Sequence, residues 1–381
     1  MEKISEMIEK LCPNGVEKVR LDSVCSFTRG KTITATNAIE GSVPVIAGGQ
    51  TPSYYHNEAN RTGDTVVVAG SGAYAGFVSY WQIPIYVSDA FSVDPSEELH
   101  KKFLFYFLKQ NQQKIYETQK GAGIPHVHGK DLAAFELPIP PLPIQREIVR
   151  ILDSFTSMIT NLETELASRQ KQYEYYRNKL LTFDKDDESV EWKTLGEISK
   201  IARGASPRPI KKYITNSISG VNWIKIGDVE PDAKYITKSN ERITEEGVKK
   251  SRFLHAGDFI LSNSMSFGRP YILKIDGCIH DGWISMSGFE GYVNSDYLYH
   301  VLNTHGIQSY WKSKANDGGA MSNLNSDIVN ATPIPIPSLQ RQQEIVSILD
   351  TFESMITNLK EEIAARKKQY EYYREQLLNL P

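Results

Sequence analysis

Residues 138–181 read PIPPLPIQREIVRILDSFTSMITNLETELASRQKQYEYYRNKLL, and residues 335–378 read PIPSLQRQQEIVSILDTFESMITNLKEEIAARKKQYEYYREQLL. At an offset of 197, the two stretches are identical at 30 of 44 positions. An internal repeat of this strength indicates that one structural unit occurs twice in the chain. The organisation of both halves therefore follows from this stretch.

Each copy opens with an extended, proline-rich segment, because proline restricts both itself and the residue before it. Apolar residues then recur at alternating steps of four and three, a 3.5-residue period that is typical of a coiled coil. The stretch that follows this period is about 33 residues long, which corresponds to a helix of roughly 50 Å. The predicted seam positions are Ile148, Leu152, Phe155, Ile159, Leu162, Leu166, Arg169, Tyr173, Tyr176 and Leu180 in the first copy, and Ile345, Leu349, Phe352, Ile356, Leu359, Ile363, Arg366, Tyr370, Tyr373 and Leu377 in the second.

Two features of the helices go beyond seam packing. Arg169 and Arg366 interrupt the apolar seam at equivalent positions of the two copies. A polar residue in a seam commonly fixes the register in which the two helices pair. Outward positions also match between the copies: Asp153/Asp350, Ser157/Ser354, Thr160/Thr357, Asn161/Asn358, Lys171/Lys368, Glu174/Glu371 and Tyr175/Tyr372. We infer that each helix presents the same face to the same partner, bound twice. The alternative is homogenisation of the two copies by recombination.

The duplication continues weakly into the globular parts. Gly63 and Gly257 each precede an aspartate and an apolar strand, and residues 89–91 (DAF) parallel residues 281–283 (DGW). Short alternating β runs followed by helices, at 103–110 and 297–304, predict α+β domains with a twisted sheet. The predicted segments are a globular domain at 1–137, a helix at 138–185, a globular domain at 186–333 and a helix at 334–381. The loops differ most, which suits two different ligands.

Composition favours a soluble protein of two domains. The 381 residues are 40% hydrophobic, and three cysteines are too few for a disulfide framework or a zinc site. The first residues lack a signal-peptide pattern and no apolar run reaches 18 residues, so a cytoplasmic protein without a membrane span is expected. The net charge is −3, and none of the four segments is strongly basic. Any affinity for nucleic acid must therefore come from clustered loops or from a partner.

No catalytic motif is recognisable. The sequence contains no phosphate-binding loop, no dinucleotide-binding turn and no Asn-Pro-Pro-aromatic segment. Residues 231–234 (PDAK) are similar to a nuclease carboxylate–lysine pair, but without an identifiable second carboxylate they predict a surface turn. His126 and His128 could place two imidazoles on one side of a strand, as in some metal sites. A polar contact loop is the preferred interpretation, and we expect no enzyme activity, metal or cofactor in this chain.

The loops suit nucleic acid. Arginine and lysine read guanine edges, asparagine and glutamine read adenine, and serine, tyrosine and lysine also bind phosphates. The DNA-contact candidates are Arg29, Lys31, Thr32, Gln50, Ser53, Tyr54, Tyr55, His56, His126, His128 and Lys130 in the first half, and Arg203, Ser206, Arg208, Lys211, Lys212, Asn263, Ser264, Ser266 and Arg269 in the second. The alternative is that they are ordinary residues of surface loops.

The order of these parts resembles a known family over essentially the whole chain. The most specific features are the repeated segments 145–148 (QREI) and 342–345 (QQEI), and residues 203–207 (RGASP) with 223–228 (WIKIGD). Together they resemble the specificity subunit of Type I restriction–modification enzymes.

The resemblance implies a non-catalytic subunit that binds double-stranded DNA. Each target-recognition domain would read one half of a bipartite, asymmetric sequence through the major groove. The two helices would pair as an antiparallel coiled coil and set the spacer between the halves. Two modification subunits would bring S-adenosylmethionine, and two restriction subunits would bring ATP, Mg²⁺ and cleavage. The recognition loops are the variable part of this family, so the contact residues cannot be transferred one by one.

Two rival interpretations follow from the same sequence. The coiled coil could join two binding domains for another ligand, such as a peptide or a glycan, and such a scaffold would show no sequence-selective DNA binding. The chain could also serve a single-chain or two-subunit restriction enzyme of related type.

Overall fold

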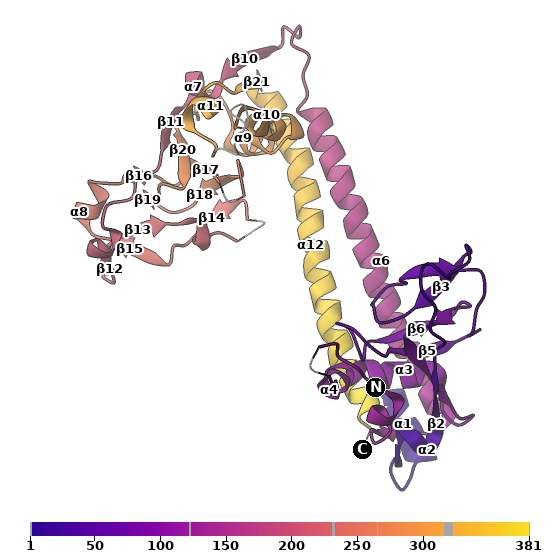
Figure 1. The fold of residues 1–381 in the computed structure, drawn as a ribbon. Coiled ribbons are helices and arrows are strands. Elements are labelled where there is room, and N and C mark those ends of the chain that lie inside the picture. The colour runs from indigo at the N-terminus through magenta and orange to yellow at the C-terminus, as the bar shows by residue number, and fades with distance from the viewer. Residues whose placement is uncertain (1, 122, 231–232, 265, 316–322, 381) are drawn as a thin grey trace. The chain divides into compact units, whose positions relative to one another are not determined.

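The computed structural model describes residues 2–121, 123–230, 233–264, 266–315 and 323–380. The chain forms two compact units: unit 1 comprises Met1–Thr164 and Lys360–Pro381, and unit 2 comprises Glu165–Leu359. Two long helices, α6 (Leu142–Leu180) and α12 (Leu339–Leu378), contribute to both units. Each unit therefore combines one globular part with part of each long helix (Figure 1).

The two long helices pack antiparallel. In unit 1, the ring of Phe155 on α6 stacks on Tyr373 of α12, with ring centroids 5.4 Å apart. In unit 2, Tyr176 of α6 stacks on Phe352 of α12, again at 5.4 Å. The second pair is the first with the roles of the two copies exchanged, as expected when two equivalent heptad helices run in opposite directions. The predicted antiparallel arrangement is confirmed.

Burial along the helices follows the heptad pattern. All predicted seam residues are buried or half-buried except Tyr176, which lies at the edge of the seam and is 40% exposed. The seam arginines are held by their own helices. Arg169 donates to Glu165 at 3.4 Å and to Gln172 at 3.2 Å. Arg366 makes the equivalent contacts in α12, to Glu362 and Gln369. The hydrocarbon part of each arginine can therefore occupy the seam while its charge is neutralised locally.

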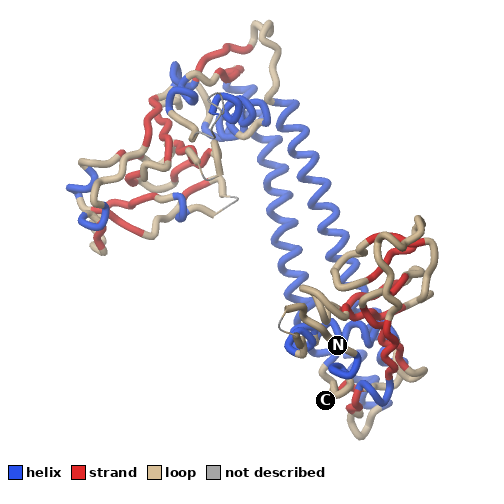
Figure 2. Tube along the Cα trace, viewed as in Figure 1, coloured by secondary structure: helices blue, strands red, loops and turns tan. Residues whose placement is uncertain are grey.

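The strands and short helices lie in the two globular parts, and the long helices are uninterrupted (Figure 2). The remaining elements of unit 1 are α1 (Glu2–Leu11), β1 (Lys18–Arg20), α2 (Leu21–Val24), β2 (Cys25–Arg29), β3 (Val43–Ile46), β4 (Tyr54–His56), β5 (Thr65–Ala69), β6 (Val78–Trp81), β7 (Tyr86–Val87), β8 (Ala90–Pro95), α3 (Lys101–Gln110), α4 (Gln112–Glu117), α5 (Gly129–Leu132) and β9 (Glu136–Pro138).

The elements of unit 2 between α6 and α12 are β10 (Val190–Thr194), α7 (Leu195–Ile198), β11 (Lys200–Arg203), η1 (Ile210–Lys212), β12 (Ile214–Thr215), β13 (Val221–Ile224), η2 (Ile226–Asp228), β14 (Tyr235–Ile236), β15 (Glu241–Ile243), α8 (Glu245–Val248), β16 (Arg252–Leu254), β17 (Phe259–Ser262), β18 (Pro270–Leu273), β19 (Gly277–Ile279), β20 (Trp283–Ser287), α9 (Ser295–Leu302), α10 (His305–Ala315), α11 (Ser326–Asn330) and β21 (Pro333–Pro337).

The two globular parts share a sheet plan. One sheet has the strand order β2-β8-β5-β6 in unit 1 and β11-β20-β17-β18-β14 in unit 2. A second sheet contains one parallel pair in each unit, β3 with β7 and β13 with β19. The matched turns before β5 and β17 contain Gly63 and Gly257, whose φ angles of +72° and +104° favour glycine. The predicted α+β class is confirmed, and the glycine framework is common to both halves.

Both long helices complete the core of each globular part. In unit 1, Val66 of β5, Phe91 of β8 and Leu104 of α3 belong to one buried cluster with Leu152 of α6 and Leu377 of α12. The core of unit 2 is built in the same way, from β17, β20, α9, the end of α6 and the start of α12. The C-terminal turns of the second repeat helix therefore stabilise the first globular part.

A buried glutamine ties each helix to its globular part. Gln145 is fully buried, and its Oε1 accepts the backbone N–H of His100, the residue that caps α3, at 2.8 Å. Its Nε2 donates to the carbonyls of Glu98 at 2.9 Å and Pro140 at 2.7 Å. Gln342 is also fully buried and makes the equivalent three contacts at the start of α9. This explains the glutamine in both QxEI segments.

Replacing Gln342 by alanine should lower the free energy of unfolding of unit 2 by about 1–3 kcal/mol, because buried backbone groups would lose their partners. Urea unfolding of the full chain measures this change. The exposed neighbour Gln343 is the matched control, and its alanine variant should differ little from wild type. An equal effect of the two substitutions would contradict the assigned role of Gln342.

Candidate nucleic-acid interface

In unit 2, candidate residues from two segments, one at the end of β11 and one after β17, gather around Asp281, which lies between β19 and β20. Ser206 donates to its carboxylate at 2.7 Å, and Arg208 forms an ion pair with it at 3.5 Å. The backbone carbonyl of Asp281 accepts from Arg203 Nε at 2.9 Å and from Asn263 Nδ2 at 3.2 Å. We call these five residues the Asp281 cluster. The sheet plan thus brings together residues that are up to 78 positions apart in the chain.

The Asp281 cluster holds positive charge beside a fixed anion. The hydrogen bond from Ser206, together with the nearby charges of His280 and Arg203, holds the pKa of Asp281 below its ordinary value. The carboxylate is therefore ionised at neutral pH and orients the arginine next to it. The side chain of Arg208 is 84% exposed. Its guanidinium has the geometry that binds a guanine edge or a phosphate in two places.

In unit 1, Asp89 takes the corresponding place between β7 and β8. Its carboxylate accepts a hydrogen bond from Ser71, and Ser71 pairs with His126 through an isolated β-bridge. The backbone N–H of Lys31 donates to the carbonyl of Val87 at 3.0 Å, which fixes the loop after β2 to the strand before Asp89. Lys31 and His126 therefore belong to loops that converge on Asp89.

The two central aspartates were absent from the predicted DNA-contact candidates. The sequence did carry a signal for them, since Asp89 and Asp281 are matched in globular parts that otherwise diverge. Their role in organising the loops requires knowledge of which loops converge, and only the sheet topology supplies that.

Besides Arg203, Ser206 and Arg208 of the Asp281 cluster, three predicted candidates are engaged within the protein. His56 is buried, and its ring nitrogen lies 3.0 Å from the backbone nitrogen of Ile39. Asn263 is also buried. The hydroxyl of the half-buried Tyr54 donates to the carbonyl of Ile33. These residues shape their loops, and we leave them out of the proposed direct contacts with DNA.

Most other candidates lie at the surface. Ser206 and Arg269 are half-buried, and the guanidinium of Arg269 lies 5.6 Å from the ring centre of Tyr271. The exposed candidates are Arg29, Lys31, Thr32, Gln50, Ser53, Tyr55, His126, His128, Lys130, Arg203, Arg208, Lys211, Lys212, Ser264 and Ser266. Direct contact of any of these residues with DNA stays a prediction.

His126 and His128 stack on each other, with ring centroids 6.1 Å apart. Throughout the described ranges, the one group of three metal-ligand side chains lies elsewhere, at His300, Asp350 and Glu353. The histidine pair therefore has no third ligand among the residues that the structure describes, and the contact-loop interpretation is preferred.

The side chain of Lys234 is less exposed than the predicted surface turn implies. Pro231 and Asp232 lie outside the described residues, but the side chain of Lys234 is only 14% exposed. Its ammonium lies 2.8 Å from Asp296 and 3.5 Å from Asp350. Burial alone would lower the pKa of Lys234, but these carboxylates raise it above the ordinary value. The prediction of a surface position was wrong for this lysine, because the carboxylates that hold it are distant in sequence.

Asp153 and Asp350, predicted as partner contacts, bind the globular parts of their own units. Asp153 lies 2.8 Å from the ammonium of Lys102 and 2.5 Å from the hydroxyl of Tyr106. Asp350 lies 3.1 Å from Nε2 of the buried His300. These contacts suffice to explain why both aspartates match between the copies, so we leave the pair out of the proposed partner surface.

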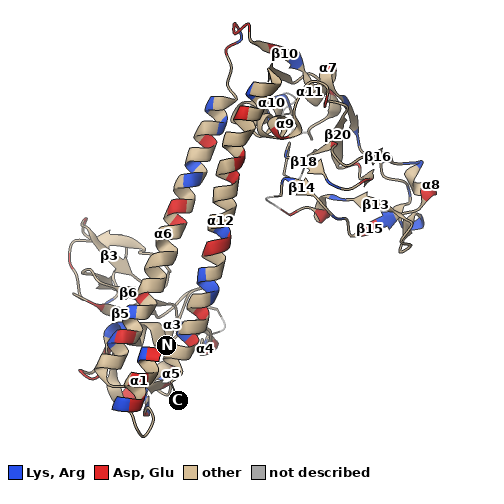
Figure 3. Ribbon diagram, turned by 180° about the vertical axis from the view of Figure 1, so that it is seen from behind, with Lys and Arg blue, Asp and Glu red and all other residues tan. Residues whose placement is uncertain are grey.

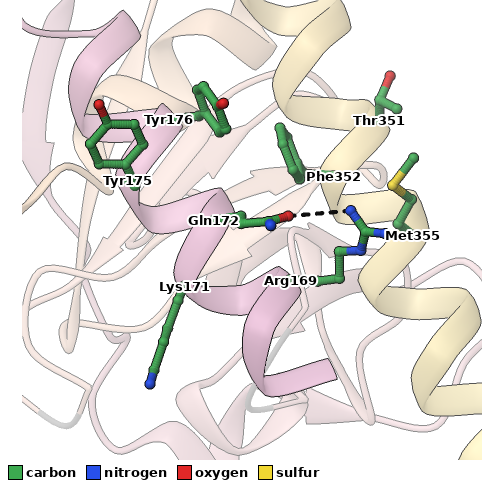
Figure 4. A pocket seen from close by; sticks show the side chains of 8 residues that line it. All are labelled: Arg169, Lys171, Gln172, Tyr175, Tyr176, Thr351, Phe352 and Met355. Atoms are coloured by element: carbon green, nitrogen blue, oxygen red, sulfur yellow. Dashed lines mark hydrogen bonds between the residues drawn. The ribbon is translucent and has the colours of Figure 1, made fainter. Parts of the chain in front are cut away.

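An open groove lies between the long helices in unit 2, with a volume of about 550 Å³ (Figure 4). Tyr175 is 57% exposed and Met355 is 43% exposed. In the groove, Gln172 accepts a hydrogen bond from Arg169. We call this surface the tyrosine groove, and its lining residues are Arg169, Lys171, Gln172, Tyr175, Tyr176, Thr351, Phe352 and Met355.

The residues of the tyrosine groove recur in the other copy. Seven of the eight are identical at an offset of 197, and Thr351 is replaced by Ser154. In unit 1 the equivalents of Tyr175 and Met355 are again exposed, with Tyr372 at 60% and Met158 at 39%. The methionines were not among the predicted partner contacts, although their identity in both copies is visible in the sequence. Each unit thus presents the same aromatic and basic surface on its helices.

Charge is mixed along both long helices, with acidic and basic residues interspersed (Figure 3). The helices therefore offer no continuous basic strip to a DNA backbone, whose binding depends on clustered lysine and arginine. Within the part of the chain that the structure describes, no helix combines the length and hydrophobicity needed to span a bilayer.

Comparison with known proteins identifies the family. A family model described as "Type I restriction modification DNA specificity domain" matches residues 13–169 and 188–366. A putative Type I restriction enzyme specificity subunit of Haemophilus influenzae is 30% identical over 405 residues, covering 98% of each chain. The specificity subunit of the EcoR124I/EcoR124II enzyme of Escherichia coli is 34% identical over 250 residues, or 63% of this chain and 60% of that one.

Solved structures show the same fold. The S subunit of a Type I restriction–modification system from M. genitalium superposes with a TM-score of 0.64 at 18% identity, covering 96% of this chain and 97% of that chain. The HsdS subunit of Thermoanaerobacter tengcongensis gives a TM-score of 0.52 at 17% identity, with the same coverage.

This chain belongs to the specificity subunits of Type I restriction–modification systems, the non-catalytic components that determine which DNA sequence the complex recognises.

Proposed function

We propose that the chain reads a bipartite, asymmetric DNA sequence, with one half bound by residues 1–137 and the other by residues 186–333. The observation that supports this most is the pair of loop clusters around Asp89 and Asp281, which occupy equivalent places on a shared sheet plan but carry different side chains. A shared framework with different loops suits two different base sequences. Target mapping with a variant in each globular part, Arg29→Ala in the first and Arg208→Ala in the second, tests the proposal.

The exposed arginines and lysines of each cluster enter the major groove in this proposal. Arginine reads guanine there through two hydrogen bonds, while serine, lysine and backbone groups fix the position on the phosphates. The net charge of −3 limits what the chain contributes to phosphate binding. The partner subunits therefore supply much of the phosphate contact.

The partners in this proposal are two modification subunits and two restriction subunits. One modification subunit docks on the tyrosine groove of unit 2, and the other docks on the matching residues of unit 1. The modification subunits bring S-adenosylmethionine, and the restriction subunits bring ATP and Mg²⁺. The support is that the residues lining the groove recur in the other copy and that Tyr372 and Met158 are exposed there, since a surface that occurs twice fits a partner that binds twice. The exposed matched residues Asn161, Lys171, Glu174 and Tyr175, with Asn358, Lys368, Glu371 and Tyr372, belong to the same partner surface. The assembled complex acts on chromosomal DNA, so we place it in the cytoplasm.

Replacing Tyr175 by aspartate should remove one modification subunit from the assembly, and replacing Tyr372 should remove the other. Each substitution places a charge in an exposed aromatic surface, where truncation of a central tyrosine typically weakens binding about tenfold or more. Native mass spectrometry of the reconstituted complex counts the subunits. The double variant should bind neither.

Ser168 provides a control, because it is exposed on α6 but its counterpart in the second copy is Ala365. Ser168→Asp should leave both partner subunits bound. If Tyr175→Asp and Tyr372→Asp also left both bound, the repeated groove would not be the docking surface.

A further inference from the structure

Two residues that are identical in the repeat differ in burial between the units. The side chain of Glu147 is 10% exposed, whereas that of its counterpart Glu344 is 49% exposed. Ile151 is half-buried against the core of unit 1, whereas its counterpart Ile348 is 42% exposed. The sequences agree at these positions, so the difference comes from what covers them.

In unit 1 the N-terminal helix α1 lies against this face of α6. Lys3 of α1 forms an ion pair with Glu147 at 3.1 Å. Ile4 is 2% exposed, and Met7 and Ile8 pack against the same core cluster as Ile151. Hydrogen bonds from Arg150 and Lys3 lower the pKa of Glu147 to about 2. The amphipathic helix α1 therefore covers apolar surface and places a lysine on the repeat glutamate.

Unit 2 has no counterpart of α1 in the segment that precedes its first strand. The chain between the end of α6 and the start of β10, residues 181–189, is described throughout and contains no helix. The equivalent face of α12 is left open, and a shallow groove of about 720 Å³ lies on it. We call this surface the α12 face, and its residues are Leu339, Gln340, Gln343, Glu344, Ser347 and Ile348.

We propose that the α12 face is a docking site, used once per chain, for an amphipathic helix from another subunit of the complex. The occupant carries apolar residues spaced as Ile4, Met7 and Ile8 are in α1, and a lysine or arginine opposite Glu344. The template for this contact is α1 itself, which occupies the equivalent face of α6. This inference rests on the proposed function, since another subunit supplies the helix.

A second copy of the chain fits the α12 face less well than another protein does. Each chain has two equivalent faces, on α6 and α12, but one helix α1. If two copies exchanged α1, one face per chain would still be open, whatever the number of copies. A helix from a different polypeptide covers the face without uncovering another.

The chemistry of the α12 face supports an occupant with a basic residue. Glu344 pairs with Arg341 of its own helix at 3.1 Å, an exposed contact that an incoming cation can replace. Ser347 stands where the first copy has Arg150, which in unit 1 holds Glu147. Glu344 thus pairs with one intrahelical arginine, as Glu147 does, but among the described residues it has no second cation such as the one that Lys3 provides in unit 1.

Cysteine alkylation tests the proposal. Ile348→Cys and the matched Ile151→Cys are introduced separately into the full chain, and N-ethylmaleimide labelling is followed by peptide mapping. In the free chain, the thiol at position 348 should react at least tenfold faster than the thiol at position 151, which is half-buried against the core of unit 1. After assembly with the modification and restriction subunits, labelling at 348 should slow at least tenfold and labelling at 151 should not change. Glu344→Lys in the Ile348→Cys chain should restore much of the labelling in the complex.

Each other outcome overturns the proposal. Equal reactivity at 348 before and after assembly would show that no subunit covers the face. Protection that rises with the concentration of the free chain would identify a second copy as the occupant. The same preparation is assayed for sequence-specific DNA methylation: specific methylation with an unprotected position 348 removes this inference alone, whereas absence of sequence specificity removes the proposed function.

Discussion

Arg208→Ala should weaken recognition of one half of the DNA target and leave the other half unchanged. The side chain of Arg208 is 84% exposed in the Asp281 cluster, and Asp281 holds it at 3.5 Å. Loss of a bidentate contact with guanine costs about 1–3 kcal/mol and relaxes the preference at that base. Binding of the assembled complex to oligonucleotides with single-base changes in each half should therefore show a loss of roughly 5- to 150-fold at one half-site.

Arg29→Ala is the reciprocal control, because Arg29 is exposed at the end of β2 in unit 1. It should affect the opposite half-site. Asp281→Asn tests whether the aspartate acts by positioning: it keeps the size of the side chain and removes the charge, and its effect should fall on the same half-site as that of Arg208→Ala. Equal loss at both half-sites for any of these variants would contradict the assignment of one globular part to each half.

One additional heptad in both long helices should lengthen the unspecified spacer between the half-sites. The insertions are placed at repeat-equivalent positions, after Glu165 in α6 and after Glu362 in α12, so that both helices gain the same seam. Seven residues extend a helix by about 10 Å, which corresponds to about three base pairs at roughly 3.4 Å each. Because seven residues are two full turns of the 3.5-residue period, the insertions also keep the same face of each helix toward its partner.

The measurement is the target of the modified complex, read from methylated DNA. The bases of each half-site should stay the same while the spacer grows. Insertion into α6 alone serves as the control: it breaks the pairing of the two seams and should destabilise the chain. An unchanged spacer in the double-insertion variant would show that the helices do not set the distance.

The sequence predicted the helices well because their determinants are local. A 3.5-residue period is visible without knowing the fold, and both α6 and α12 follow it from end to end. The shared glycine turns before β5 and β17 were recognisable for the same reason. The antiparallel pairing required the family resemblance, because a heptad pattern alone does not fix the direction of the partner helix.

The sites were harder to predict because they depend on contacts between distant segments. The Asp281 cluster joins loops from β11, β17 and β19, and that meeting follows from strand order. The imidazole of His56 is a side chain of the kind that contacts DNA, but it is hydrogen-bonded to the backbone of Ile39, 17 positions away in the sequence. Lys234 was assigned to the surface because Asp296 and Asp350 are not near it in sequence. The open α12 face was invisible for a related reason, since identical residues acquire different burial from the helix beside one copy.

Modified-base sequencing of genomic DNA tests the central claim most directly. It is applied to cells that carry the wild-type chain, the Arg29→Ala chain or the Arg208→Ala chain, each with its partner subunits. The wild-type chain should yield a motif of two specified parts separated by unspecified bases, and each variant should relax a different part. A continuous motif, or relaxation of the same part by both variants, would contradict the account of two globular parts that read two different half-sites.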